Sequence, residues 1–496
     1  MTKNAVRTKM SVKNAAATMV NRICGMALNF FARGVFVRTL GAEYLGLGGF
    51  FGNIFALVSL CELGFGAAFT QSLYKPIADN DEKAVCAVMN YFSKVYGAVA
   101  ATSTVISVCV MPFLKLIVKG QTEIPGLYSI YLLFMLHNTV SFLLAPKRIM
   151  LAADQKMYVC ANIHTAFSFL IFGAQIAVLC LTQNYILYLS SRIVLLTVEA
   201  ICINMYADRQ YPFLDGDYLP DKAYKDRLFT KVKALMLHKT GSVLTHSTDS
   251  ILISYFLGLE CMGRYSNYAL VIGSVVTLVD IAVGAVSSSV GNLGATADKD
   301  KNENIMRKLG FMNFALLTVC SCVLITTLNP IIGLWLGENM LFNQAEVAVI
   351  VSCFYFSCIR DPVQIFINAY GIFEPSRYMN LARAAVNLVL SVLFIGKFGI
   401  AGVFLGTVIS VFAVPLWCEP YVLYKYGFTR SAAGFAAEFT VFTVFSALCC
   451  VLCFFVCRDF PQTLFYTVLR AGVSALISSA TIVVCFSKKL AGVFKK

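Results

Sequence analysis

Basic and amide side chains recur along one face of the first hydrophobic segment. Thr18, Arg22, Gly25, Asn29 and Arg33 interrupt a run of Ala, Val, Ile, Met, Leu and Phe. At the helical angle per residue, all five fall within roughly 80° of one another. A guanidinium near a bilayer centre costs about 2.5–3.5 kcal/mol on insertion scales, so a wet cavity or a partner is expected beside it. The stripe predicts an anion-binding path through a membrane, with Arg22, Asn29 and Arg33 binding substrate.

A second polar face lies 217 residues further along the chain. Lys239, His246 and Asp249 share one helix face, again within roughly 80°. A gapless shift of 217 residues places Arg22 on Lys239. The same shift places Asn29 on His246. We therefore expect these three side chains to bind substrate from an equivalent helix of a second repeat.

Further polar side chains interrupt the later hydrophobic segments. Arg383 shares a face with Asn387, and the preceding segment carries Arg360, Asp361, Gln364 and Asn368. Polar groups at membrane depth are best explained by a hydrated lumen. On this interpretation, the residues that bind substrate are Arg383, Arg360, Asp361, Gln364 and Asn368. The alternative is an ion pair, either Arg360–Asp361 or one to another helix, that fixes packing beside the Pro362 kink.

Acidic residues are rarer in the apolar segments. Glu62 and Asp280 lie at nearly equivalent depth in the two repeats. They either form structural ion pairs with the basic side chains or bind a coupling proton or Na⁺. Arg192 and Glu199 are seven residues apart and share a face, which suggests a structural role. We interpret His137 and His164 as packing residues.

The composition identifies the class of protein. Of 496 residues, 58% are hydrophobic and only 13% are charged, and the mean hydropathy is +0.74. A soluble domain carries about 25% charged residues. The net charge of +14 comes from basic residues in short loops, so it indicates no nucleic-acid partner. No nucleotide-binding, hydrolase or metalloprotease motif is present. We expect no enzymatic activity, no cofactor and no metal.

Fourteen hydrophobic stretches are long enough to span a bilayer. Lys and Arg concentrate in both tails and in alternate loops, which predicts that both termini are cytoplasmic. The fold class is therefore an all-α polytopic membrane protein. The stretches lie near 14–39, 45–73, 84–113, 126–146, 157–182, 185–206, 234–257, 264–291, 307–328, 345–370, 378–396, 400–423, 433–456 and 462–486.

The repeat and the loops divide the chain into four parts. Residues 1–206 form a first lobe of six helices, and 207–233 form a cytoplasmic amphipathic linker. Residues 234–428 form a second lobe of six helices, and 429–496 hold two further helices and a basic tail. Because the repeats run in the same direction, we expect an axis along the membrane normal and a central cavity.

Three sequence motifs resemble a known family. They are Arg38-Thr-Leu-Gly-Ala-Glu-Tyr-Leu-Gly-Leu, Glu62-Leu-Gly-Phe-Gly and Ser72-Leu-Tyr-Lys-Pro-Ile-Ala-Asp. They look like the polysaccharide-exporter branch of the multidrug/oligosaccharidyl-lipid/polysaccharide (MOP) flippases. The resemblance implies alternating access of two lobes around a cationic cavity, with Arg22 and Arg33 as cavity arginines. It also implies an undecaprenyl-pyrophosphate-linked oligosaccharide as substrate, in the bacterial plasma membrane.

Our leading hypothesis is a flippase that exports a lipid-linked sugar for surface polysaccharide. Its partners would be that substrate, membrane lipids, a coupling H⁺ or Na⁺ and polysaccharide-assembly proteins. A cation-coupled multidrug exporter of the same superfamily is the first alternative. A membrane glycosyltransferase or polymerase is the second, although the short outer loops leave little room for an active site.

Overall fold

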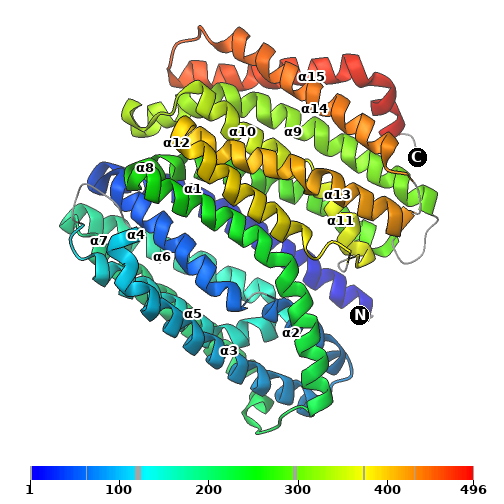
Figure 1. The fold of residues 1–496 in the computed structure, drawn as a ribbon. Coiled ribbons are helices and arrows are strands. Elements are labelled where there is room, and N and C mark those ends of the chain that lie inside the picture. The colour runs from blue at the N-terminus through cyan, green and yellow to red at the C-terminus, as the bar shows by residue number, and fades with distance from the viewer. Residues whose placement is uncertain are drawn as a thin grey trace. The chain divides into compact units, whose positions relative to one another are not determined.

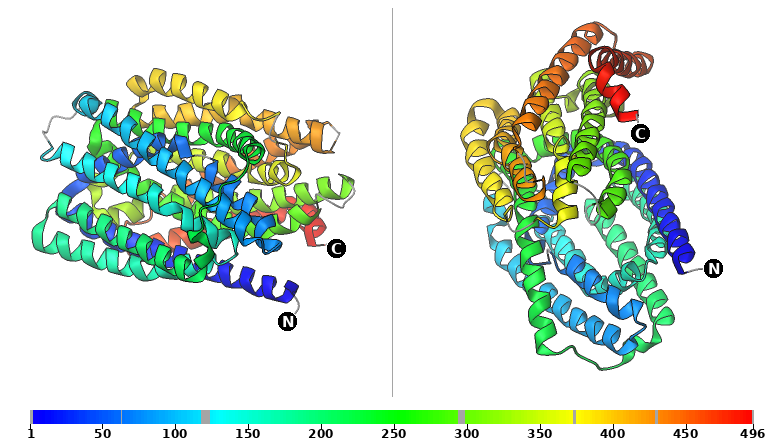
Figure 2. Two further views of the ribbon diagram at one scale, coloured as in Figure 1. Left: turned by 90° about the horizontal axis from the view of Figure 1, so that it is seen from below. Right: turned by 90° about the vertical axis from the view of Figure 1, so that its right-hand side faces the viewer.

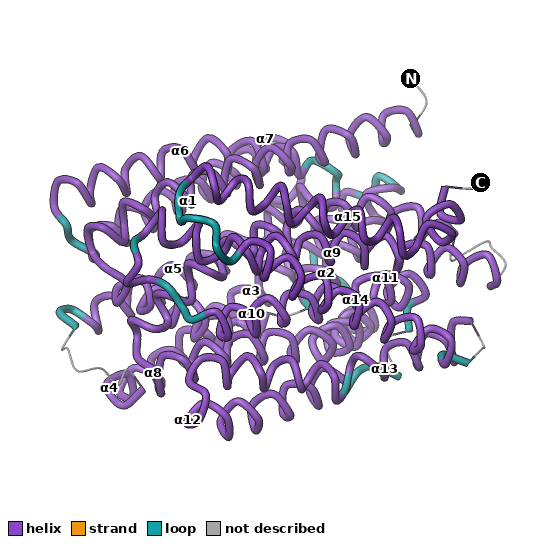
Figure 3. The backbone as a smooth tube through the Cα atoms, turned by 90° about the horizontal axis from the view of Figure 1, so that it is seen from above, coloured by secondary structure: helices purple, strands orange, loops and turns teal. Residues whose placement is uncertain are grey.

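Helices form almost all of the chain that the structure describes. The computed structural model describes residues 3–62, 64–117, 124–293, 299–372, 375–428 and 431–494. Figure 3 shows these residues as helices joined by short loops, with no strand among them. Eleven helices in this part are long and apolar enough to cross a membrane. The prediction of an all-α polytopic membrane protein is confirmed.

The chain divides into two compact units. The first holds Met1–Val243 with Gly258–Gly263, and the second holds Leu244–Leu257 with Arg264–Lys496. The first unit contains most of its helices in chain order: α1 (Lys3–Val58), η1 (Ser59–Glu62), α2 (Phe65–Ala78), α3 (Glu82–Val110), η2 (Met111–Phe113), α4 (Leu114–Ile117), α5 (Leu127–Ala153), α6 (Met157–Thr182), α7 (Tyr185–Gln210) and η3 (Pro212–Asp215).

Helix α8 (Lys222–Leu293) contributes to both units, and the remaining helices belong to the second unit. These are α9 (Lys299–Leu336), η4 (Glu338–Met340), α10 (Gln344–Cys358), α11 (Asp361–Tyr370), α12 (Met379–Ala413), α13 (Pro415–Val422), the π-helix η5 (Leu423–Phe428), α14 (Ala433–Cys457) and α15 (Leu464–Phe494).

Within the first unit, α6 packs between α1 and α7, and α5 packs between α7 and α3. Within the second unit, α9 packs against α10, α14 and α15, and α12 packs against α10. The orange α14 and red α15 lie beside each other in Figures 1 and 2. These helix contacts bring side chains from distant parts of the sequence together.

Asparagine side chains begin two of the spanning helices. Asn184 caps α7, where its side chain accepts hydrogen bonds from the backbone amides of Ile186 and Leu187. Asn343 and Glu346 form a capping box at the start of α10. A side-chain acceptor satisfies amides that have no partner inside the helix, so these residues fix where the helices start.

Three spanning helices contain a non-helical glycine. The breaks occur at Gly41 in α1, Gly258 in α8 and Gly399 in α12, all with positive φ. Only glycine adopts this conformation without a steric cost. In Figure 1 the ribbon of α1 runs away from the N-terminus and then turns back. Each break divides one long candidate span into two. The eleven candidate spans therefore agree with the predicted number of about fourteen.

The breaks in α1 and α8 support the internal repeat. Gly41 has φ 83° and ψ 178°, and Gly258 has φ 87° and ψ 166°. The two glycines are aligned by the 217-residue shift found in the sequence. The boundaries predicted for the four sequence segments remain predictions.

A second pair of repeat-related glycines allows a close helix crossing in the first unit. A Cβ on Gly46 would overlap the backbone carbonyl of Leu259. A Cβ on Gly263 would overlap the backbone carbonyl of Ala42. Each glycine therefore lies against the backbone of the other segment. Small residues are what allow two membrane helices to approach this closely.

Charged side chains attach α14 and α15 to the second unit. Arg307 in α9 donates to Glu303 in the same helix, and its Nη1 lies 3.2 Å from Glu438 in α14. The Nζ of Lys489 in α15 lies 3.2 Å from the same Glu438 carboxylate. One carboxylate thus bridges three helices, which fixes the last two helices against α9.

The crossing makes a testable prediction about stability. We expect Gly46→Ala to lower the free energy of unfolding by about 1–3 kcal/mol or more, because the methyl group overlaps a backbone carbonyl. Gly52→Ala is the control, since a Cβ there meets no atom within 4 Å. Thermal melting of the purified variants measures both effects. Equal melting temperatures for Gly46→Ala and Gly52→Ala would contradict the close crossing.

Candidate functional site

The polar stripe of α1 is only partly exposed. Arg22 and Asn29 are exposed, and Arg33 is half-buried. The Asn29 side chain donates to the Gly25 carbonyl at 2.8 Å, a contact inside its own helix. Arg33 is therefore the residue of this stripe that the fold surrounds most closely with other helices.

Arg33 belongs to a cationic cluster built from several helices of the first unit. Its guanidinium lies within electrostatic reach of Tyr188 and Arg192 in α7. His137 in α5 also lies within reach of Arg192. The Tyr188 hydroxyl lies beside Gln175 of α6. Two guanidiniums, an imidazole and a phenol form a set of donors that suits a phosphate-bearing anion.

The sequence interpretation missed two members of this cluster. Arg192 was assigned a structural role with Glu199, and His137 a packing role. A signal for Arg192 was present, since an arginine in the centre of a spanning helix is costly unless it faces water or a partner. Its proximity to Arg33 could not be read from the sequence, because 159 residues separate them.

Glu199 forms a separate cluster on the same helix. It accepts a hydrogen bond from Arg148 at 3.1 Å. The Nδ1 of His164 lies 3.0 Å from each of its two oxygens. Glu199 is buried, whereas Arg148 and His164 keep nearly half of their side chains exposed.

In the second unit, the structure brings together three predicted residues. Asp249 and Arg383 are buried, and His246 is exposed. Arg383 lies within electrostatic reach of both His246 and Asp249. The backbone of Lys239 lies in α8, but its side chain is outside the described residues. The remaining predictions for this stripe therefore concern His246, Asp249 and Arg383.

Oxygen atoms surround the Asp249 carboxylate. Thr407 donates to Asp249 Oδ2 at 2.8 Å, and Asn387 donates to Thr407 at 2.8 Å. Ser391 donates to the Val403 carbonyl at 3.1 Å beside them. In the part of the chain that the structure describes, Asp249 Oδ1 and Asn387 Oδ1 are buried and accept no hydrogen bond. Buried acceptors without donors suit a small cation or a proton.

Arg360 is buried in an ion pair. Its Nε donates to Glu419 Oε2 at 2.9 Å, and its Nη2 donates to Glu419 Oε1. Gln364 adds a hydrogen bond to the same carboxylate at 3.3 Å. Both charged side chains are about 5% exposed or less. The geometry supports the interhelical ion pair considered for Arg360 more directly than contact with a substrate.

The other predicted residues are dispersed. Asp361 is half-buried and within electrostatic reach of Asp280, which is exposed. Asn368 is exposed near the end of α11. Glu62 is half-buried and accepts a hydrogen bond from Tyr96 at 2.6 Å. Glu62 lies in the first unit and Asp280 in the second.

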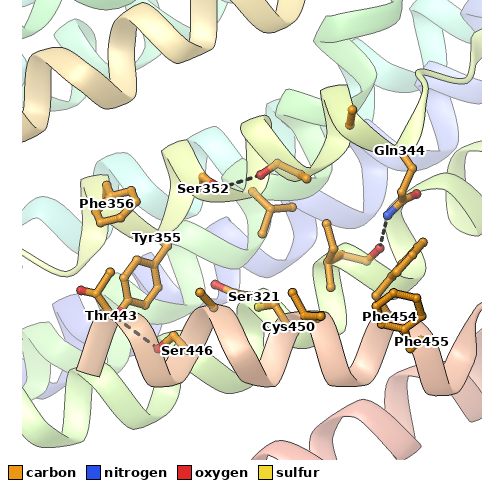
Figure 4. A pocket seen from close by; sticks show the side chains of 16 residues that line it. Ser321, Gln344, Ser352, Tyr355, Phe356, Thr443, Ser446, Cys450, Phe454 and Phe455 are labelled. Carbon is orange, nitrogen blue, oxygen red and sulfur yellow. Dashed lines mark hydrogen bonds between the residues drawn. The ribbon is translucent and has the colours of Figure 1, made fainter. Parts of the chain in front are cut away.

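An apolar cavity of about 410 Å³ lies between α9, α10 and α14 of the second unit. Figure 4 shows aromatic side chains at both ends, including Phe356 and Phe454. The hydroxyls of Ser321 and Thr443 are buried, with no hydrogen-bond partner among the described residues. A cavity of this composition suits a hydrocarbon chain.

The structure resembles solved transporters. It matches the lipid II flippase MurJ in an inward closed conformation with a TM-score of 0.65, at 14% identity, over 97% of this chain and 100% of MurJ. It matches an inward-facing multidrug resistance MATE transporter of the MOP superfamily with a TM-score of 0.61, at 12% identity, over 82% and 98%. The fold is that of the MOP-superfamily transporters.

A third MOP-fold structure comes from Pyrococcus furiosus. It matches with a TM-score of 0.56 at 12% identity, over 84% of this chain and 96% of that protein, and is described as having a binding pocket of reverse polarity. No protein-family model and no curated protein matches the chain. Because all identities are low, the comparisons establish the MOP fold and leave the substrate to the site residues.

The buried ion pair gives a prediction about stability. Arg360→Ala should lower the free energy of unfolding by about 3–5 kcal/mol, because it leaves the Glu419 carboxylate buried without its partner. The double variant Arg360→Leu/Glu419→Leu should lose much less, since it removes both charges. Melting temperatures of the three purified proteins check this, and a single variant as stable as wild type would show that the pair is dispensable.

Proposed function

We propose that this protein is a flippase for a lipid-linked sugar that carries a diphosphate. The observation that carries the proposal is the cluster of Arg33, Arg192 and His137 on α1, α7 and α5. Guanidiniums bind phosphate oxygens through paired hydrogen bonds. A cationic side chain at membrane depth is costly without a partner, and a negatively charged substrate would be such a partner.

The apolar cavity supports a lipid substrate. Its volume of about 410 Å³ suits a segment of a prenyl or acyl chain, and most of its lining surface is apolar. In this proposal the lipid tail occupies apolar surface of this kind while the sugar-diphosphate head contacts polar groups. Asn29, Gln175 and the phenols of α7 supply hydrogen-bonding groups for the head.

The extent of the structural match also supports the flippase over the drug exporter. The lipid II flippase matches 97% of this chain, whereas the MATE structures match 82–85%. The difference is comparable to the length of α14 and α15. A cation-coupled drug exporter remains the second candidate, because MATE transporters share the fold.

The Asp249 cage is the proposed site of the coupling ion. Asp249, Asn387, Thr407 and the Val403 carbonyl supply oxygen atoms to one buried place. A Na⁺ or a proton bound there would neutralise the buried carboxylate. Glu62 has a close phenol donor and Asp280 is exposed, so Asp249 is the better-placed acid.

The remaining features of the proposal follow from the sequence. The family resemblance implies the bacterial plasma membrane, and the distribution of Lys and Arg predicts that both termini lie in the cytoplasm. The protein would act by alternating access and serve polysaccharide-assembly proteins. No part of the proposal requires enzymatic activity or a cofactor.

Loss of the Arg33 guanidinium should impair flipping. We expect Arg33→Gln to reduce transport of a fluorescent prenyl-diphosphate sugar in liposomes by about tenfold, because a charge-assisted hydrogen bond to phosphate is lost. Arg22→Gln tests the exposed part of the stripe. Arg458→Gln is the control, since this arginine lies after α14 and pairs with its neighbour Asp459. Unchanged flipping by Arg33→Gln, together with transport of organic cations, would favour the drug exporter.

Removal of the Asp249 charge should uncouple transport from the ion. Asp249→Asn keeps the shape of the side chain and removes the charge that would hold Na⁺ or a proton. We expect transport by this variant to lose its dependence on an imposed Na⁺ or pH gradient. Glu62→Gln and Asp280→Asn are compared in the same liposomes. If either of these abolishes the dependence while Asp249→Asn retains it, the coupling site lies elsewhere.

A further inference from the structure

Glu199 organises two basic side chains from two other helices. It lies on α7, is 2% exposed, and receives hydrogen bonds from Arg148 of α5 and His164 of α6. Both carboxylate oxygens contact His164 Nδ1, at 3.0 Å each. The acid therefore holds an arginine and a histidine in a fixed arrangement across three neighbouring helices.

The two donors face open space. Arg148 uses Nη2 for its contact with Glu199, and 45% of its side chain remains exposed. The His164 side chain is 44% exposed, and Nε2 lies at the opposite side of the ring from the bonded Nδ1. A guanidinium carries five N–H donors in a planar fork. The N–H groups of Arg148 and His164 on their exposed sides can therefore donate hydrogen bonds to a ligand.

This cluster lies on the same face as the Arg33 cluster. Glu199 follows Arg192 by seven residues on α7, which is a rotation of about 20° and a rise of about 10 Å. Arg148 follows His137 by eleven residues on α5, which is again about 20°, with a rise of about 16 Å. The two helices therefore present two levels of basic side chains, one above the other.

We propose that Arg148 and His164, positioned by Glu199, form a second binding site for the phosphate-bearing group of the substrate. This inference rests on the proposed flippase function and adds a site to it. The group would contact the Arg148/His164 level at one stage of transport and the Arg33/Arg192 level at another. The ligand chemistry is a phosphate or diphosphate, either free or attached to a lipid.

The buried acid gives the second site a distinct property. Glu199 neutralises part of the positive charge at the Arg148/His164 level, whereas the Arg33 cluster combines two guanidiniums with an imidazole. An anion should therefore bind more weakly beside Glu199. A weak site next to a stronger one allows the anion to dissociate. Transport requires this dissociation, which two tight sites would prevent.

The experiment uses the full-length protein in phosphatidylcholine nanodiscs. Calorimetry measures binding of farnesyl diphosphate and of inorganic pyrophosphate. The binding curves are fitted with two sites, and we expect Arg148→Gln to weaken the weaker of them about tenfold, because a charge-assisted contact is removed there. Glu199→Gln should tighten binding several-fold, since the competing charge is removed while the shape of the side chain is kept. The control is Lys147→Gln, which removes an adjacent cation that is paired with Asp208.

The outcomes separate the site from the function. If wild type binds neither probe, the proposed function fails and the second site with it. If wild type binds and Arg148→Gln matches Lys147→Gln, the second site is wrong and the flippase proposal stands. A stability role alone would lower the melting temperature of Glu199→Gln without tightening binding. If Arg148→Gln does not fold, the double variant Arg148→Gln/Glu199→Gln is compared with Glu199→Gln, and binding about tenfold weaker than that of Glu199→Gln supports the site.

Discussion

A charged side chain inside a membrane-spanning helix needs a partner, and this requirement organises the structure. Burial without compensation costs several kcal/mol, because lipid offers no hydrogen bonds. Arg360 meets Glu419, and Glu199 meets Arg148 and His164. Each of these contacts joins side chains from different helices. The charges therefore act as fixed points for helix packing.

Glycines determine where the helices turn and cross, and so where these charges meet. The breaks at Gly41 and Gly258 have nearly the same backbone angles at equivalent positions of the repeat. The crossing at Gly46 and Gly263 is closer than any side chain would allow. An ancestral duplication explains why both pairs recur at one spacing. The polar stripes differ between the repeats, which indicates that the scaffold was retained while its chemistry diverged.

In the proposed function, three chemical environments would contact the parts of an amphiphilic, anionic substrate and its coupling ion. The Arg33 cluster offers cations, the cavity beside α14 offers hydrocarbon, and the Asp249 cage offers oxygen atoms. A drug exporter for organic cations has no use for the first of these. The Arg360–Glu419 pair belongs to a different category, because both of its members are already satisfied inside the protein.

Hydropathy alone determined the class and the approximate number of spans, because these properties depend only on local composition and helical period. The sequence also revealed the 217-residue repeat, which the glycine breaks support. The tertiary structure decided which charges meet. Glu419 was not recognised as the partner of Arg360, since the two are 59 residues apart. The proximity of Arg192 to Arg33 and His137 also came only from the folded structure. A period along one helix identifies a face, but only packing determines what that face contacts.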